Sequence, residues 1–285
     1  SSRIDLVDSR ENLILRTPNI SLLYELQVAF AVEAWRRRYG RAIRSWLTTI
    51  GEIEALVSLA AYSYEHPGDP FAEFVEGEDT QFVGECLGHP LISAEKNIRN
   101  DAHLDQATRA LVVSGSNMSG KSTYLRTIGL NAVLAMAGAP VRATILRLAP
   151  VQVASSLHVV DSLQTGRSGF ASELGRLREI MVLMQHDLPV LFLVDELLHG
   201  TNSHDRLAGG QALLRAFITY GAIGVVTTHD LSITQIPLDL QAMVRNAHFE
   251  DRVEDGHMVF DYRLREGVVV RSNALELMRS IGLDV

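Results

Sequence analysis

Apolar side chains recur at helical spacing between residues 20 and 65, and this pattern predicts helices. Gly40 interrupts the pattern, and Pro67-Gly68-Asp69-Pro70 ends it. The arginine-rich stretch at residues 36–44 could contact a phosphate backbone, although a solvated helix face is the simpler interpretation. We therefore expect an all-helical N-terminal segment over residues 1–75, a helical lever that precedes the next domain.

From about residue 80 onward, short apolar runs alternate with helical segments. The apolar runs that predict buried strands are Ala110–Ser114, Val190–Val194 and Ile223–Thr228. The helical segments are residues 122–137, 170–186, 208–219 and 273–281. This alternation predicts an α/β domain over residues 76–285, with a mainly parallel sheet and right-handed crossovers. Residues 248–252 and 258–264 predict an antiparallel hairpin at the sheet edge.

The composition limits the classes of function that we consider. The chain has 34 acidic and 26 basic residues, so its net charge of −8 gives no general attraction for nucleic acid. Its one cysteine, Cys86, allows no internal disulfide and no paired-cysteine metal site. We find no signal peptide and no apolar run of the roughly 18 residues that span a membrane. A cytoplasmic protein without a membrane segment is expected, and the start at Ser1 fits a piece of a longer chain.

Residues 115–122 carry the most specific motif. They read Gly-Ser-Asn-Met-Ser-Gly-Lys-Ser and match G-x-x-x-x-G-K-[ST] at every fixed position. Lys121 is one of only two lysines, whereas the other 24 basic residues are arginine. A phosphate-binding loop needs a compact ammonium, because the wider arginine fork does not fit the same nest of amides. The loop is therefore expected to bind a nucleoside triphosphate, with Ser122 as a ligand of Mg²⁺.

Two further motifs follow predicted strands. Asp195 and Glu196 come directly after Val190–Val194, where buried carboxylates are costly unless a metal or hydrogen bonds offset their burial. We interpret Asp195 as a magnesium ligand, usually through water, and Glu196 as the general base. His229 follows Ile223–Thr228 and could sense the γ-phosphate or hold the attacking water, although a lone histidine is more often structural.

A fourth segment, Thr-Gly-Arg-Ser-Gly-Phe at residues 165–170, precedes a helix and could offer amides to an anion, although an ordinary loop fits equally well. Together, in this order and spacing, the four motifs resemble the ATPase domain of the MutS family of DNA mismatch-repair proteins. The Asn-Met pair inside the glycine loop is much more specific than a general phosphate loop. The resemblance covers about residues 80–283 and includes Gly88-His89-Pro90, which is similar to the family segment that opens this domain.

The resemblance implies an ABC-type ATPase of the P-loop NTPase class that works as a homodimer and couples ATP binding and hydrolysis to changes on DNA. The nucleotide-binding residues that it implies around the loop are Gly115, Ser116, Asn117, Met118, Ser119, Gly120, Lys121, Ser122 and Thr123. Within this set, Asn117 would contact the γ-phosphate side, and Lys121 the β- and γ-phosphates. Tyr262 falls where the family places a ring against the adenine, and Ser168 would reach the nucleotide of the partner subunit.

The chain departs from the family pattern at several positions. Ile98, with Asn97, stands where the family often has an aromatic residue on the second face of the adenine. His199 replaces the arginine that follows the paired acids, and Ser116 and Ser119 replace a proline and a glycine of the loop. No segment resembles the mismatch-reading domain with its Phe-x-Glu wedge.

We therefore expect a MutS-like module that binds and hydrolyses Mg-ATP as a dimer and serves DNA repair, without reading mismatches by this chain alone. Two alternatives stay open. The chain could be a scaffold that dimerises on ATP and hydrolyses little, or an ABC-type ATPase that serves a non-DNA partner such as a membrane assembly.

Overall fold

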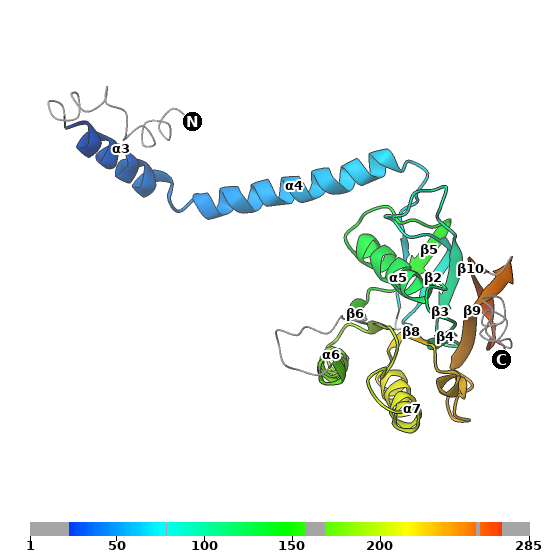
Figure 1. Cartoon of the computed structure of the whole chain (residues 1–285). Helices are drawn as coiled ribbons and strands as arrows, with labels where there is room; N and C mark the ends of the chain where they lie inside the picture. The colour runs from blue at the N-terminus through cyan, green and yellow to red at the C-terminus, as the bar shows by residue number, and fades with distance from the viewer. Residues whose placement is uncertain (1–22, 78, 158–168, 255–256, 270–285) are drawn as a thin grey trace. The chain divides into compact units, whose positions relative to one another are not determined.

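The computed structural model describes residues 23–77, 79–157, 169–254 and 257–269 (Figure 1). The chain divides into two compact units, Ser1–Ala61 and Tyr62–Val285. The described helices near the N-terminus are α3 (Tyr24–Tyr39) and α4 (Ile43–Glu65), and they are separated at Gly40 as predicted. No residue of α4 is buried. The predicted domain boundary near residue 75 stays a prediction.

The helix α3 carries a local charge cluster. Glu33 accepts hydrogen bonds from Arg36 at 2.7 and 2.8 Å and from Arg37 at 3.0 Å. These bonds lower the pKa of the partly exposed Glu33 carboxyl to about 2. Within the described part of the chain, no helix combines the length and apolar character needed to cross a membrane.

The second unit contains a six-stranded sheet in the order β10-β9-β4-β8-β7-β6. Its strands are β4 (Ala110–Ser114), β6 (Gln152–Ser156), β7 (Val190–Val194), β8 (Ile223–Thr228), β9 (Val244–Glu254) and β10 (His257–Glu266). The neighbours from β9 to β6 pair in parallel, and β10 pairs antiparallel with β9. The predicted parallel sheet with an antiparallel hairpin at one edge is thus confirmed, although β9 is longer than expected.

A second, four-stranded sheet has the order β1-β5-β2-β3 and was not predicted. Its strands are β1 (Glu73–Phe74), β2 (Phe82–Leu87), β3 (Asn100–Leu104) and β5 (Ile145–Leu148). The strand β2 pairs antiparallel with both β3 and β5. These strands are short and include many polar residues, so no unbroken apolar run marks them.

Helices cover both faces of the larger sheet. They are α5 (Lys121–Met136), α6 (Gly169–Leu183) and α7 (Ser203–Thr219), with a 3₁₀ helix, η2 (Leu231–Thr234), after β8. The helix α7 begins earlier than predicted because the Asn202 side chain caps it and accepts a hydrogen bond from the amide of Asp205 at 3.0 Å. The predicted helix at residues 273–281 lies outside the described residues.

The core consists of two apolar clusters, one on each face of the larger sheet. Leu191 and Leu193 of β7 pack with α5 and the smaller sheet, whereas Phe192 packs with α6 and α7. Figure 1 accordingly shows α5 on one side of the larger sheet and α6 and α7 on the other. Burial on both faces explains the unbroken apolar run of β7. The parallel arrangement also brings the carboxyl ends of β4, β7 and β8 to one edge of the sheet.

Candidate active site

The glycine loop connects β4 to α5, as predicted. Lys121 begins α5, and its side chain is almost completely buried. Its Nζ donates hydrogen bonds to the carbonyl oxygens of Gly115 at 2.9 Å and Ser116 at 2.8 Å. Burial lowers the pKa of Lys121, while the charges of Glu196 and Asp195 oppose this shift. The loop therefore curls around a centrally held ammonium group that interacts electrostatically with two carboxylates.

Two serine hydroxyls complete the loop. Ser119 is buried, and the side-chain oxygens of Ser116 and Ser119 have no hydrogen-bond partner among the described residues. Buried hydroxyl groups in proteins are normally paired, so unpaired ones indicate a place where a polar ligand fits. The exposed Met118 adopts a left-handed backbone with φ of 68° at the outer turn of the loop.

Asp195 and Glu196 follow β7, and one threonine of β8 connects them. Thr227 Oγ1 donates to Asp195 Oδ1 at 2.6 Å and accepts from the amide of Glu196 at 3.0 Å. Asp195 and Thr227 are both buried. No role was predicted for Thr227, and its only signal in the sequence is its position two residues before His229. Thr227 fixes the carboxylate of one acid and the backbone of the other.

The backbone at and just after the second of the paired acids is strained. Glu196 and Leu198 have φ of 53° and 56°, which costs a residue with a side chain about 1 kcal/mol or more. The amide of Leu197 donates to the carbonyl of Thr227 at 3.2 Å, and that of Leu198 donates to Glu173 Oε1 of α6 at 2.6 Å. These contacts from β8 and α6 stabilise the turn that presents Glu196.

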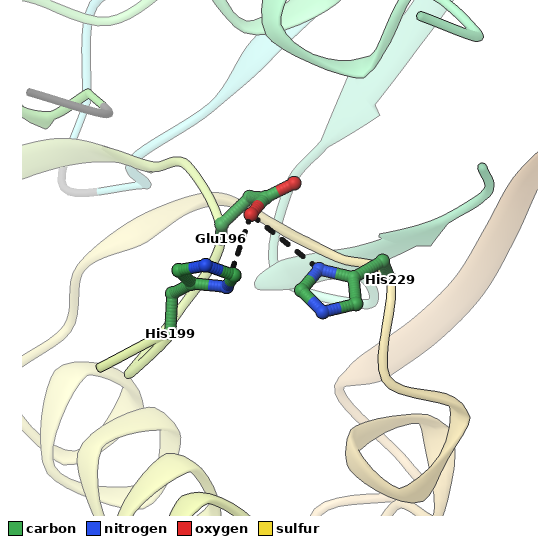
Figure 2. Close-up of side chains that lie close together, drawn as sticks. All are labelled: Glu196, His199 and His229. Carbon is green, nitrogen blue, oxygen red and sulfur yellow. Dashed lines mark ion pairs between the residues drawn. The ribbon is translucent and has the colours of Figure 1, made fainter. Parts of the chain in front are cut away.

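Two histidines face the carboxylate of Glu196 (Figure 2). Glu196 Oε2 lies 3.4 Å from His229 Nδ1 and 3.3 Å from His199 Nδ1. The two imidazole rings have centroids 5.1 Å apart and lie edge to face. The structure therefore brings His229 beside the predicted base. In the sequence, His199 is only the residue that stands in place of the family's arginine, and its contact with Glu196 was not predicted.

A pocket of about 400 Å³ opens beside the glycine loop. The predicted site residues that line it are Ile98, Asn117, Met118, Gly120, Lys121, Ser122, Thr123, Glu196 and Tyr262. Asp195 and His229 do not line the pocket. Asp195 binds Thr227, which also accepts from the Glu196 amide, and His229 contacts the Glu196 carboxylate directly. Ser168 lies outside the described residues. One concave surface thus collects residues from both sheets, the glycine loop and the end of β7.

Tyr262 lies where β10 departs from regular pairing with β9, between Phe260 and Leu264. Its φ of 55° is held by Asn100, whose Nδ2 donates to the carbonyl of Tyr262 at 2.9 Å. Asn100 Oδ1 also accepts from the amide of Leu264 at 2.7 Å. A Cβ atom at Gly120 would lie 3.2 Å from the Tyr262 ring, so the ring borders the glycine loop. This role of Asn100 in holding Tyr262 was not predicted from the sequence.

The position expected to hold a second aromatic residue is organised differently. Asn97 Nδ2 donates to the carbonyl of His89 at 2.9 Å, and its Oδ1 accepts from the amide of His89 at 3.2 Å. Asn97 therefore stabilises the turn at Gly88-His89-Pro90. The partly exposed Ile98 offers an apolar side chain to the pocket.

Comparison with known proteins adds evidence that the geometry alone does not give. A family model described as MutS domain V matches residues 111–284. The chain belongs to the MutS family. The matched range includes the glycine loop, the paired acids, His229 and Tyr262 of this MutS domain, whereas Ile98 lies before it.

Several mismatch-repair proteins are similar to this MutS-family chain. The DNA mismatch repair protein MutS of Geobacillus sp. (strain WCH70) is 27% identical over 275 residues, which are 94% of this chain and 31% of the relative. The MutS of Listeria innocua is 29% identical over 279 residues, with the same two shares. The DNA mismatch repair protein MSH3 of Phaeosphaeria nodorum is 31% identical over 247 residues, which are 84% of this chain and 22% of the relative. The chain thus spans less than a third of the length of these relatives.

Proposed function

We propose that the chain binds Mg-ATP and hydrolyses its β–γ phosphoanhydride as the ATPase module of a MutS-family protein. The observation that carries this proposal is the glycine loop curled around Lys121, with Asp195 and Glu196 at the end of β7, which lies in the same sheet with β8 between it and β4. A loop of this kind at the start of a helix presents amides and a positive charge to phosphate oxygens. The unpartnered hydroxyls of Ser116 and Ser119 support the fit, because phosphate oxygens would accept their hydrogen bonds.

Each residue has a role in the proposed reaction. Lys121 and the loop amides hold the β- and γ-phosphates, while Tyr262 and Ile98 border the adenine. Ser122 and Asp195 would hold Mg²⁺, which supplies positive charge that offsets the charge of the phosphates. Glu196 accepts a proton from water as the water oxygen attacks the γ-phosphorus in line, and the β–γ bridging oxygen leaves with ADP.

The test of this proposal separates binding from chemistry. Glu196→Gln keeps the shape of the side chain but removes the base, so we expect Mg-ATP binding within about threefold of wild type. Hydrolysis in a single turnover should fall about 10²–10⁴-fold, the usual contribution of a positioned base. The control Glu76→Gln changes an exposed acid outside the pocket and should leave both quantities unchanged. No heat on titration of the wild-type chain with millimolar Mg-ATP would overturn the proposal.

A second candidate function is a nucleotide-gated scaffold that binds ATP to dimerise and hydrolyses little. The contacts of Glu196 Oε2 with His199 and His229 favour it, because both histidines occupy the oxygen that a base would offer to water. Phosphate release in a single turnover distinguishes the two functions. A wild-type rate no higher than that of Glu196→Gln would favour the scaffold.

The relatives are named as DNA mismatch repair proteins, so we further propose that the module works as a homodimer within DNA repair. In this dimer, Ser168 of one subunit would complete the nucleotide site of the other. Mixed dimers with one Ser168→Ala subunit should lose activity at the partner's site. Stimulation of the ATPase by duplex or branched DNA at low salt would support the DNA role, whereas no effect of any DNA would favour a non-DNA partner.

A further inference from the structure

We propose that Glu196, His199 and His229 form a binding site for one divalent transition-metal ion of the zinc class. This site is separate from the magnesium position that Ser122 and Asp195 would provide. Each of the three residues offers one ligand atom, and these atoms all lie within 4.8 Å of one another. Figure 2 shows the two imidazoles turned toward the same carboxylate.

Two of the three separations between the ligand atoms match those around a tetrahedral ion, and the two histidine nitrogens lie within 4.8 Å of each other. Atoms bound at about 2.0–2.1 Å from tetrahedral zinc lie about 3.3–3.4 Å from one another. Glu196 Oε2 lies 3.3 Å from His199 Nδ1 and 3.4 Å from His229 Nδ1. Two imidazole nitrogens and one carboxylate oxygen also form a ligand set that zinc takes in proteins, whereas magnesium prefers oxygen alone.

The protein holds these ligands in place before any ion arrives. Glu196 and His199 lie on the turn after β7, and the amide of His199 donates to the carbonyl of Glu196 at 3.1 Å. His229 follows β8, whose Thr227 binds the amide of Glu196. The side chains of His199 and His229 are exposed enough for water to reach the fourth position of a bound ion.

The same geometry allows a simpler arrangement, in which each histidine donates an Nδ1–H hydrogen bond to Glu196. The two arrangements differ in what they predict for added metal. A purely hydrogen-bonded cluster takes up no ion, whereas a metal site takes up one ion per chain and depends on each histidine separately.

A consequence follows for turnover, and it rests on the proposed function. An ion bound to Glu196 Oε2 occupies the lone pair that would accept a proton from water. Zinc would therefore slow ATP hydrolysis while leaving Mg-ATP binding at the glycine loop intact. The proposed ATPase would then be switched off by a metal and restored by a chelator.

The direct test measures metal binding without nucleotide. We would titrate the wild-type chain with Zn²⁺ by calorimetry and with Co²⁺ by visible absorption, since tetrahedral Co²⁺ gives strong d–d bands. We expect one ion per chain, and at least about tenfold weaker binding in both His199→Ala and His229→Ala. The control His186→Ala removes an exposed histidine that precedes β7, whereas Glu196 and His199 follow that strand, and this variant should bind as wild type does. Equal binding in wild type and His199→Ala, or no ion bound by wild type, would overturn the site.

The second readout separates this inference from the proposed function. In the ATPase assay, Zn²⁺ should inhibit wild type at concentrations at least about tenfold lower than it inhibits His199→Ala. One ion bound per wild-type chain, together with unchanged hydrolysis in Glu196→Gln, would preserve the metal site and overturn the base assignment. ATPase activity in a wild-type chain that binds no metal would preserve the proposed function and overturn the metal site.

Discussion

Arg142 and Asp69 form an ion pair of 3.1 Å in which the two side chains are only 8% and 5% exposed. The Tyr62 hydroxyl donates to the other oxygen of Asp69 at 3.1 Å. The backbone of Arg142 is fixed from another direction, because its amide donates to Asn131 Oδ1 of α5 at 2.7 Å. The helix that begins at the glycine loop is therefore connected through hydrogen bonds to the segment that follows α4.

Removal of one partner of this ion pair should destabilise the domain strongly. In Arg142→Met, Asp69 stays buried without its guanidinium, which typically costs about 3–5 kcal/mol of unfolding free energy. The matched control is Arg147→Met, because Arg147 pairs with Glu73 at 2.7 Å with both side chains more than half exposed. An exposed pair contributes about 0–1 kcal/mol. Urea denaturation of both variants measures the difference, and equal losses would contradict the structural role of Arg142.

The phenol of Tyr62 should respond to alkaline pH in a recognisable way. Burial raises its pKa to about 12, and the charge of Asp69 adds to this effect. In an unfolded chain a tyrosine titrates near about 10, so the folded state holds the proton more tightly. The stability gained from this group is fully present below about pH 10 and is lost as the pH rises toward about 12. The difference between ultraviolet titrations of wild type and Tyr62→Phe isolates this group, and a difference centred near 10 would contradict the prediction.

Thr227 should be required for turnover although it would touch no substrate. Thr227→Val has nearly the same shape but leaves Asp195 Oδ1 without its donor and the amide of Glu196 without its acceptor. Each loss of a buried partner costs about 1–3 kcal/mol, so we expect kcat to fall roughly 10–100-fold. Thr227→Ser keeps the hydroxyl and should retain most of the activity. Steady-state phosphate release measures kcat, and a wild-type kcat in Thr227→Val would contradict the role of the hydroxyl.

Tyr262 should contribute to recognition of the base and not of the phosphates. Stacking of a base on an aromatic ring is worth about 1–3 kcal/mol, so Tyr262→Ala should raise the Kd for ATP roughly 5–150-fold. Tripolyphosphate lacks the base, and its Kd should stay unchanged. Tyr262→Phe keeps the ring and serves as the control. Equal weakening of ATP and tripolyphosphate would show that Tyr262 acts by supporting the loop at Gly120.

The sequence predicted the strands that are buried at every residue. The bounds of β4, β7 and β8 match the apolar runs because all three strands are covered on both faces. The smaller sheet escaped prediction because β3 reads Asn-Asp-Ala-His-Leu and buries only Ala102 and Leu104. Such a strand resembles a polar loop until its partners are known.

The features of the candidate site also divide into those that the sequence predicts and those that it does not. The glycine loop and the paired acids are local motifs, so their spacing was visible in the chain. The contacts of Thr227 with Glu196 and of Asn100 with Tyr262 join residues 31 and 162 positions apart. Partners at such separations follow from the order and register of the strands, which no local pattern encodes.

The bridge from Asn100 to Tyr262 has a consequence for cohesion of the domain. Asn100 belongs to the smaller sheet and Tyr262 to the larger one, and both line the pocket. A nucleotide seated there would contact both sheets at once, and its binding free energy would be forfeited whenever they separated. Amide hydrogens of β3 and β10 should then exchange more slowly, and in step with each other, as the nucleotide concentration rises.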